Sequence, residues 1–130
     1  MSFPAAVASR KAGVDAGDLD LSDVTIRVMP PWMSRGLGPG ISAITFGNCI
    51  FVSTDAYESV VSGRNSTLLI HELVHVNQWR REGWLAFLAR YMSDYLRNRL
   101  IGLDHMTAYR AIGFEAAAYD VSQRQHKDVA

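Results

Sequence analysis

The sequence predicts an α+β fold in which a small sheet precedes a set of helices. Three short runs rich in β-branched and apolar residues fall between residues 24 and 53. From residue 65 onward, apolar residues recur every three or four positions, the periodicity of amphipathic helices. Because the strands and helices occupy separate parts of the chain, we expect an N-terminal antiparallel or mixed sheet of about three strands. A central helix and two to three further helices should follow it.

Length and composition fit a single globular domain. The 130 residues are 48% hydrophobic and 10% aromatic, which is enough to bury a core. Thirteen basic residues balance thirteen acidic ones, so the net charge favours no nucleic-acid partner and we expect none. The single cysteine, Cys49, excludes an internal disulfide framework. No apolar run reaches the length of about 20 residues that a membrane span needs.

The first 22 residues are expected to form a flexible lead-in. They are rich in Ala, Gly, Ser and Asp and show no periodicity. No long apolar run follows a basic start, so we expect no secretory signal and a cytoplasmic location. The domain is then predicted to span residues 23–130.

Three strands are predicted before the helical region. The first covers Val24–Met29 and stops at a Pro-Pro pair, after which the glycine-rich Trp32–Gly40 reads as a loop. Ile41–Phe46 and Cys49–Ser53 form the other two. The intervening Gly47-Asn48 is typical of a two-residue hairpin connection.

Two long helices are predicted between residues 65 and 100. Asn65 or Ser66 can cap the first, and Gly83 can end it at positive φ. The second spans residues 84–100 and carries an apolar stripe that we expect to pack in the core, with a partner-docking or membrane-surface face as the alternative. The stripe consists of Trp84, Phe87, Leu88, Tyr91, Met92, Tyr95 and Leu96. A nearby excess of arginines predicts a solvated face or, alternatively, an acidic partner or substrate.

Two shorter helices are predicted at the C-terminal end. Asp104 can cap a helix that runs through Ile112, and Gly113 interrupts the pattern. Helical character resumes at Glu115 and continues to Gln125. Glu115 should therefore lie in the first turn of a new helix.

The most specific motif is His71-Glu72-Leu73-Val74-His75, the HExxH pattern of zinc hydrolases. Histidines four residues apart lie one turn apart on the same helix face, so both imidazoles can bind one metal ion. Glu72 is placed to deprotonate a metal-bound water. The alternative is a pair of hydrogen-bonded helix histidines beside an exposed glutamate.

A catalytic Zn²⁺ usually takes three protein ligands, so the two histidines need a third. Gln78 and Arg81 stand where a metzincin would have Gly and His, which excludes that class. Glu82 lies about 10 Å further along the helix axis than His75, too far to share the ion. Glu115 is the preferred ligand because a complete helix separates it from the motif and can fold back. The alternatives are Asp94, Asp104, Asp120 and His105.

The chemistry that these residues suit is attack by metal-activated water on a carbonyl. The ion would lower the pKa of its bound water, and Glu72 would take the proton and pass it to the leaving amine. A further donor could stabilise the oxyanion, and the candidates are Tyr109, Tyr119, His105 and Arg110. Tyr119 falls one turn after Glu115 and shares its helix face, so we select Tyr119 as the catalytic candidate.

Two segments, Ile44–Val52 and Leu69–Arg80 with Gln78, resemble the small HExxH domain found in bacteria beside polymorphic toxins and contractile injection systems. The resemblance covers about residues 40–125 and implies a minimal zincin-like fold with metallopeptidase activity. In similar chains a proline stands at the position of Gly113, before the acidic residue taken as third ligand. The resemblance also implies that one strand of the 41–53 hairpin forms the rim of the cleft, where an extended peptide could add.

These observations lead to a zinc-dependent, gluzincin-like metallopeptidase as the preferred hypothesis. His71, His75 and Glu115 would bind Zn²⁺, Glu72 would act as general base, and the substrate would be a peptide or protein. The alternative is a metal-stapled interaction module without turnover, which docks a protein partner at the 84–100 helix. A non-peptide metal hydrolase is a third possibility.

Overall fold

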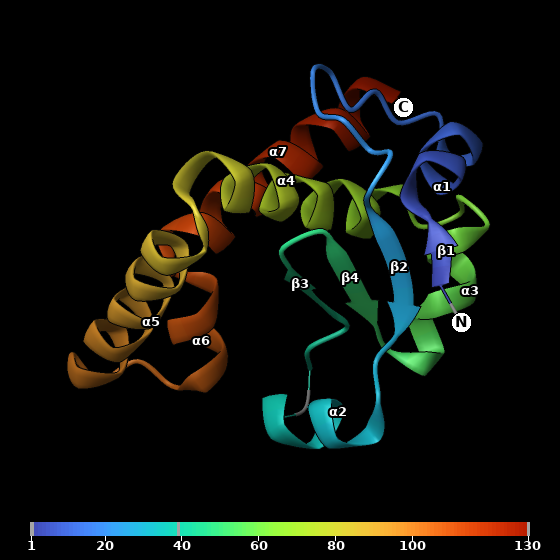
Figure 1. Cartoon of the computed structure of the whole chain (residues 1–130). Coiled ribbons are helices and arrows are strands. Elements are labelled where there is room, and N and C mark those ends of the chain that lie inside the picture. The colour runs from blue at the N-terminus through green and yellow to red at the C-terminus, as the bar shows by residue number, and fades with distance from the viewer. Residues whose placement is uncertain (1, 39, 130) are drawn as a thin grey trace.

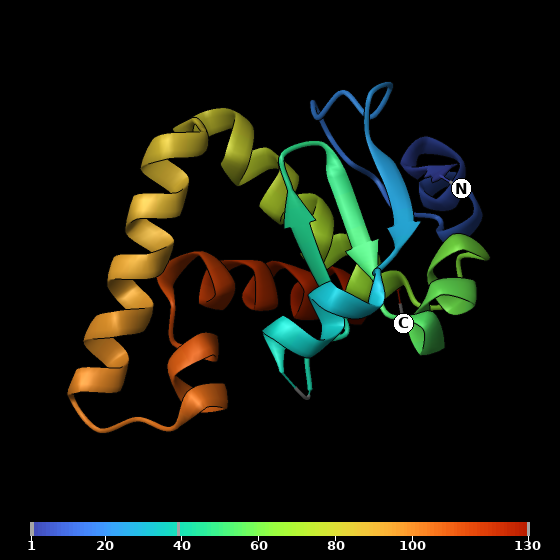
Figure 2. The same cartoon turned by 60° about the horizontal axis from the view of Figure 1, so that its bottom comes forward.

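In the computed structural model, which describes residues 2–38 and 40–129, the chain has the predicted α+β fold. The strands are β1 (Ser2–Pro4), β2 (Thr25–Val28), β3 (Ala43–Phe46) and β4 (Cys49–Val52). The helices are α1 (Ala5–Ala12), α2 (Pro31–Leu37), α3 (Thr54–Val61), α4 (Ser66–Glu82), α5 (Trp84–Leu100), α6 (His105–Arg110) and α7 (Gly113–Val129). Helices α5 and α6 lie at the opposite end of the molecule from α1 and α3 (Figures 1 and 2).

The sheet is mixed, with the strand order β1-β2-β4-β3. β2 runs parallel to β4, whereas the β1–β2 and β3–β4 pairs are antiparallel. The predicted hairpin joins β3 to β4 at Gly47-Asn48, and Gly47 adopts φ 61°, which suits glycine in such a turn. β3 is therefore an edge strand, and its outer side is unpaired in the described sheet.

Helix α4 lies between two hydrophobic clusters. The first joins one face of the sheet to α1, α3 and α4, and its members include Ile26, Ile50, Val60, Leu69 and Leu73. The second joins the C-terminal end of α4 to α5 and α7, and its buried members are Trp79, Phe87, Ile112 and Phe114. Because residues of α4 contribute to both clusters, the helix is fixed at each end by packing.

The flexible lead-in expected for residues 1–22 is wrong for Ser2–Ala12, which form β1 and α1. β1 pairs with β2, and Ala5 and Ala8 are fully buried in the first cluster. Small side chains allow α1 to approach its neighbours closely, and their low hydrophobicity is what concealed a buried helix. Met1 lies outside the described residues.

The loop expected at Trp32–Gly40 is also wrong for its first part, because Pro31–Leu37 form α2. Proline is favourable in the first turn of a helix, so the Pro-Pro pair ends β2 and begins a helix. Sequence reasoning did not identify α3, which Ser53 caps: the Ser53 hydroxyl accepts a hydrogen bond from the Ala56 N–H at 3.3 Å.

The two long helices match the prediction closely. Asn65 caps α4, with its side-chain oxygen accepting from the Leu68 N–H at 3.2 Å, and Gly83 follows the last residue with φ 82°. α5 begins and ends at the predicted residues, Trp84 and Leu100. Cap residues and apolar periodicity were sufficient to place both helices.

The break before α7 lies earlier than predicted. Asp104 caps α6 as expected, but α6 ends at Arg110, and Gly113 is already the first residue of α7. The Gly113 N–H donates to Asp94 Oδ2 on α5 at 3.1 Å, and a Cβ at this position would lie 3.3 Å from the same oxygen. Gly113 therefore permits a close approach between two helices.

The apolar stripe of α5 divides between two environments. Phe87 is buried, and Leu88, Tyr91 and Tyr95 are half-buried, in the second cluster, as core packing predicts. The remaining three members, Trp84, Met92 and Leu96, are exposed, and so are Leu85 and Leu100 on the same helix. α5 thus carries an exposed apolar face in addition to its core face.

If α1 is part of the core, Ala8→Leu should destabilise the fold. The larger side chain has no space at a fully buried position, and we expect a loss of about 1–3 kcal/mol in the free energy of unfolding. The exposed Ala86→Leu provides the control and should change that free energy by less than about 0.5 kcal/mol. Urea titration measures both variants. An unchanged Ala8→Leu protein would mean that α1 is not packed.

Candidate metal centre

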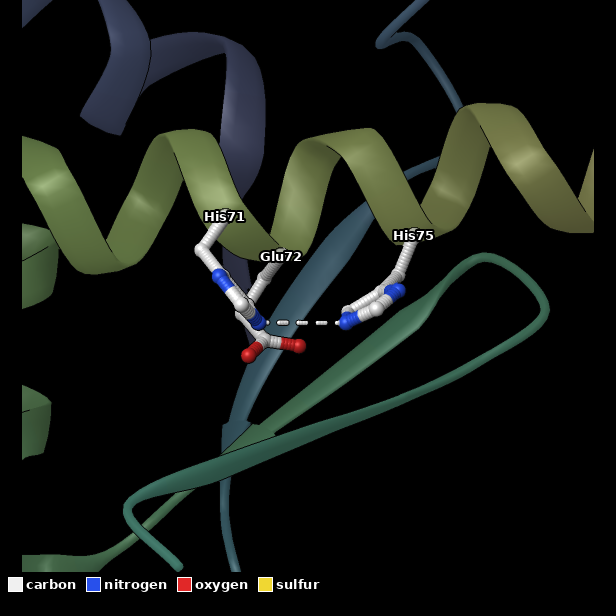
Figure 3. A group of neighbouring side chains, drawn as sticks. All are labelled: His71, Glu72 and His75. Carbon is white, nitrogen blue, oxygen red and sulfur yellow. Dashed lines mark hydrogen bonds between the residues drawn. The ribbon is translucent and has the colours of Figure 1, made fainter. Parts of the chain in front are cut away.

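The motif residues of α4 project together toward the β3–β4 hairpin (Figure 3). The Nε2 atoms of His71 and His75 lie 3.2 Å apart. Together with a Glu72 carboxylate oxygen, their candidate ligand atoms all lie within 4.8 Å of one another. The group could therefore hold a metal ion. Helical spacing alone produces the histidine pair, since i and i+4 side chains share one face.

Glu115 of α7 lies beside both imidazoles. Its Oε2 is 3.1 Å from His71 Nε2, and its Oε1 is 2.8 Å from His75 Nε2. Donor atoms that share a tetrahedral Zn²⁺ are separated by about 3.3 Å, given metal–nitrogen distances of about 2.0–2.1 Å. The three side chains thus stand at nearly the separation that one small divalent cation requires.

The other acidic and histidine candidates have different partners. Asp94 holds the start of α7, Asp104 caps α6, and Asp120 pairs with Arg124. Glu82 lies near Arg81 and Arg90, while His105 Nδ1 and the Tyr95 hydroxyl form a hydrogen bond. Among the candidate third ligands, Glu115 is therefore the one that the described structure brings to the histidine pair. Its position depends on the packing of α7 against α4.

Gln78 connects His75 to the segment that carries Glu115. Its Nε2 donates to the Phe114 carbonyl at 3.1 Å, which leaves its Oε1 to accept from His75 Nδ1 at 2.8 Å. The proton of His75 is thereby held on Nδ1, and the Nε2 lone pair is free for a metal. One buried amide thus orients a candidate ligand and anchors the residue next to another.

Thr45 and Tyr91 support the two carboxylates. The Thr45 hydroxyl donates to Glu72 Oε2 at 2.7 Å, and the Tyr91 hydroxyl donates to Glu115 Oε1 at 3.2 Å. Sequence reasoning assigned no role at the site to Thr45, Tyr91 or Gln78. The one available signal was a polar residue at a position where the pattern demands burial: Thr45 on the inward face of β3, and Gln78 on the helix face of His75.

The charges at the site favour a bound cation. Burial lowers the pKa of His75, but its hydrogen bond to Glu115 and the charges of Glu72 and Glu115 raise it overall to about 9. Burial raises the pKa of Glu115, whereas hydrogen bonds from His71 and His75 lower it overall to about 2. A positive charge between these groups is thus stabilised, whether a proton or a metal ion carries it.

Glu72 has the character of a proton acceptor. It is 2% exposed, and burial raises its pKa above the ordinary value. The neighbouring histidines and the Thr45 hydroxyl stabilise its ionised form, but burial outweighs them, whereas at Glu115 the hydrogen bonds and charges of the histidines together outweigh burial. The two carboxyl groups therefore differ in proton affinity because their surroundings differ, as an acid–base residue and a ligand require.

The four candidates for an oxyanion donor differ in how close they lie to the site. Tyr119 is 62% exposed and lines a cavity of about 310 Å³ together with His71, Glu72 and Tyr109. Tyr109, Tyr119 and Arg110 also line an adjoining cavity of about 650 Å³ with His71 and Glu115. His105 hydrogen-bonds to Tyr95 and lines neither cavity. Three of the four predicted donors thus lie around the His71 side of the site.

A family model, the eCIS core domain, matches residues 5–83. The name refers to extracellular contractile injection systems. The chain belongs to this family. No curated protein and no solved structure matches the chain. The match includes Thr45, the whole HExxH motif and Gln78, and it ends where α4 gives way to α5. Glu115 of this eCIS core protein therefore lies in the part of the chain beyond the match.

The match confirms the association with contractile injection systems that the two segments predicted. It begins at the first residue of α1, so the family segment includes this helix, which lies in the part of the sequence expected to be a flexible lead-in. None of the helices in the described part of the chain is both long and apolar enough to cross a membrane.

The metal-free protein should be most stable in mildly acid solution and lose stability at both lower and higher pH. The raised pKa of His75 gives stability that is present below 6.5 and lost as the pH rises through about 9. The lowered pKa of Glu115 gives stability that is present above 4.5 and lost as the pH falls toward about 2. The raised pKa of Glu72 gives stability that is present below 4.5 and lost as the pH rises through that raised pKa, so it adds to the loss toward alkaline pH.

Urea unfolding in the presence of a chelator, at acid, mildly acid and alkaline pH, measures this dependence. Glu115→Gln should flatten both limbs, since it removes the charge that the two shifts share. Equal stability of the wild-type protein at pH 5.5 and 9.5 would contradict the electrostatic description.

Gln78→Leu should weaken divalent-cation binding by about 10–100-fold, because neither the His75 ring nor the Phe114 carbonyl keeps its partner. Gln78→Glu retains an acceptor for His75 Nδ1 and should lose less affinity. Asn77→Leu, at an exposed neighbouring position, is the control. Titration calorimetry with Zn²⁺ or Co²⁺ measures the affinities. Equal affinities in all four proteins would exclude a role for Gln78 in positioning the ligand.

Proposed function

We propose that this eCIS core protein is a zinc-dependent metallopeptidase of gluzincin type. His71, His75 and Glu115 would hold Zn²⁺, and Glu72 would act as general base. The observation that carries the proposal is the convergence of Glu115 on the histidine pair from a helix 40 residues further along the chain. Three such donors beside a separately held carboxylate are the components of a catalytic zinc site.

Each residue of the site has its own proposed role in hydrolysis. A Zn²⁺ ion held there would supply Lewis-acid activation of water and of the substrate carbonyl. Glu72 receives the water's proton, for which its buried position and raised pKa are suited. The Thr45 hydrogen bond holds the carboxylate in place, so that it can then deliver the proton to the leaving amine. Tyr119 is our candidate donor to the developing oxyanion.

The proposed substrate is an extended peptide or protein segment that lies along β3. This strand is one of the two edges of the described sheet, so its backbone can pair with another chain. The strand and the segment before it border a cavity on each side of the site. Ile41, Ser42 and Ala43 line the cavity near His71, whereas Ile44 and Phe46 line one near His75. A bound segment would therefore have room for side chains on both sides of its reacting carbonyl.

A metal-stapled interaction module is the second candidate, and the exposed face of α5 is the observation that favours it. Trp84, Leu85, Met92 and Leu96 present apolar surface to solvent. Exposed apolar patches of this kind are typical of protein–protein contacts. Membership of the eCIS core family supports a protein partner, and we propose α5 as its docking site.

Glu72→Gln separates the two candidates. The variant keeps the shape of the side chain and all three proposed ligands but cannot accept a proton. We expect it to bind Zn²⁺ in the same stoichiometry as the wild type and to lose peptide cleavage by a factor of about 100 or more. A protein library and a peptide library are incubated with each variant, and mass spectrometry detects cleavage. Metal analysis of the same variants gives the stoichiometry.

The companion variants test the ligand set. His75→Ala and Glu115→Ala should each lose metal, whereas the exposed Glu58→Ala should not. Equal cleavage by wild type and Glu72→Gln would exclude the proposed base. Two results together would favour the interaction module. The wild type would be fully occupied by metal but would cleave nothing, and Glu72→Gln would leave partner binding unchanged.

A further inference from the structure

A small cavity between β3 and α5 adjoins the metal centre on its His75 side. It has a volume of about 50 Å³. Its walls are mostly apolar and aromatic side chains from β3, α4 and α5: Ile44, Phe46, Trp79, Phe87, Leu88 and Tyr91. His75 and Glu115 also border it, so anything bound inside lies next to two of the proposed metal ligands.

The aromatic walls form a connected stack. The ring centroids of Phe46 and Trp79 are 5.3 Å apart, those of Trp79 and Phe87 are 4.5 Å apart, and those of Phe87 and Phe114 are 4.7 Å apart. The Arg90 guanidinium lies 4.6 Å from the centre of the Phe114 ring and covers the outer end of the stack. Trp79 and Phe87 are buried, so packing holds these two walls of the cavity in place before a ligand enters, whereas Phe46 is 55% exposed.

One polar group in these walls has no partner. Trp79 is 7% exposed, and its indole N–H is buried without a hydrogen-bond acceptor among the described residues. A buried donor without a partner is unfavourable, because it has lost its hydration and no hydrogen bond replaces it. An acceptor brought within hydrogen-bond distance of this N–H would restore the missing bond.

We infer that the cavity binds one small, uncharged side chain of the substrate, and that the Trp79 N–H donates to an oxygen in that side chain. This inference rests on the proposed function and specifies the substrate class of the same site. The residue in the cavity would lie next to the scissile bond, because the cavity borders His75 and Glu115.

The size and lining of the cavity define which side chains fit. A water needs about 10–15 Å³ of such volume, so the cavity accommodates about three to five non-hydrogen atoms. Thr, Val, Asn and Leu are within this range, whereas Phe, Arg and Lys exceed it or carry charge. A buried charge among aromatic walls would lose its hydration without compensation. The unpaired N–H then favours Thr over Val and Asn over Leu, which have nearly the same shapes.

Zinc-loaded Glu72→Gln protein allows binding to be measured without cleavage. The ligands are peptides of one sequence that carry Thr, Val, Asn, Leu, Phe or Lys at each position in turn, and calorimetry gives their affinities. At one position we expect Thr to bind about three- to tenfold more tightly than Val. Phe and Lys at that position should bind about tenfold more weakly than Thr, or worse.

Three further substitutions test the walls in the same background. Trp79→Phe keeps an aromatic ring but removes the N–H, and should abolish the preference for Thr over Val. Leu88→Ala enlarges the cavity and should admit Phe, whereas Leu85→Ala, on the exposed face of the same helix, should not.

Three results would overturn the inference. The affinities could be independent of the residue at every position, the unaltered cavity could accept Phe, or no peptide could bind. Selective binding without cleavage by the wild type would exclude the peptidase proposal and leave the cavity assignment intact. Cleavage at a rate that does not depend on the varied residue would exclude the cavity assignment and leave the peptidase proposal intact.

Discussion

The site depends on one buried amide that holds two helices in register. Gln78 joins the imidazole of His75 to the carbonyl of Phe114, so α4 and α7 cannot slide past each other without breaking a hydrogen bond inside the protein. The alternative to this contact is a desolvated amide with no partner, which is costlier than a lost surface contact. The same contact fixes the tautomer of the histidine. This interaction therefore couples the local geometry of the ligands to the packing of the C-terminal helix.

The site also lies where the two hydrophobic clusters meet. The sheet-side cluster packs against the N-terminal part of α4, and the aromatic cluster packs against its C-terminal end. His75 lies between Leu73 and Trp79, which belong to different clusters. Rigid packing on both sides restricts the ligand atoms to a narrow range of separations, and such restriction is what preorganises a metal site.

Local chemistry in the sequence predicted much of this arrangement. The Asn65 cap, the Gly47-Asn48 turn and the apolar periodicity of α4 and α5 placed those elements within one or two residues. The HExxH spacing placed His71, Glu72 and His75 on adjoining helix positions, and the interruption near Gly113 indicated that Glu115 begins a new helix. Each of these inferences rests on contacts within about four residues along the chain, which periodicity and capping describe well.

The features that the sequence did not predict depend on contacts between distant segments. Ala5 and Ala8 form a buried helix only because β1 pairs with β2, and neither alanine carries a hydrophobic signal. Which part of the α5 stripe faces the core depends on where α7 packs. Thr45 and Gln78 became functional candidates only when their partners were known. The family match, too, ends before α5, whereas the carboxylate beside both imidazoles comes from α7. The family segment contains His71, Glu72 and His75 but not Glu115, so whether another member could surround a metal ion in the same way depends on the helix that follows the shared segment.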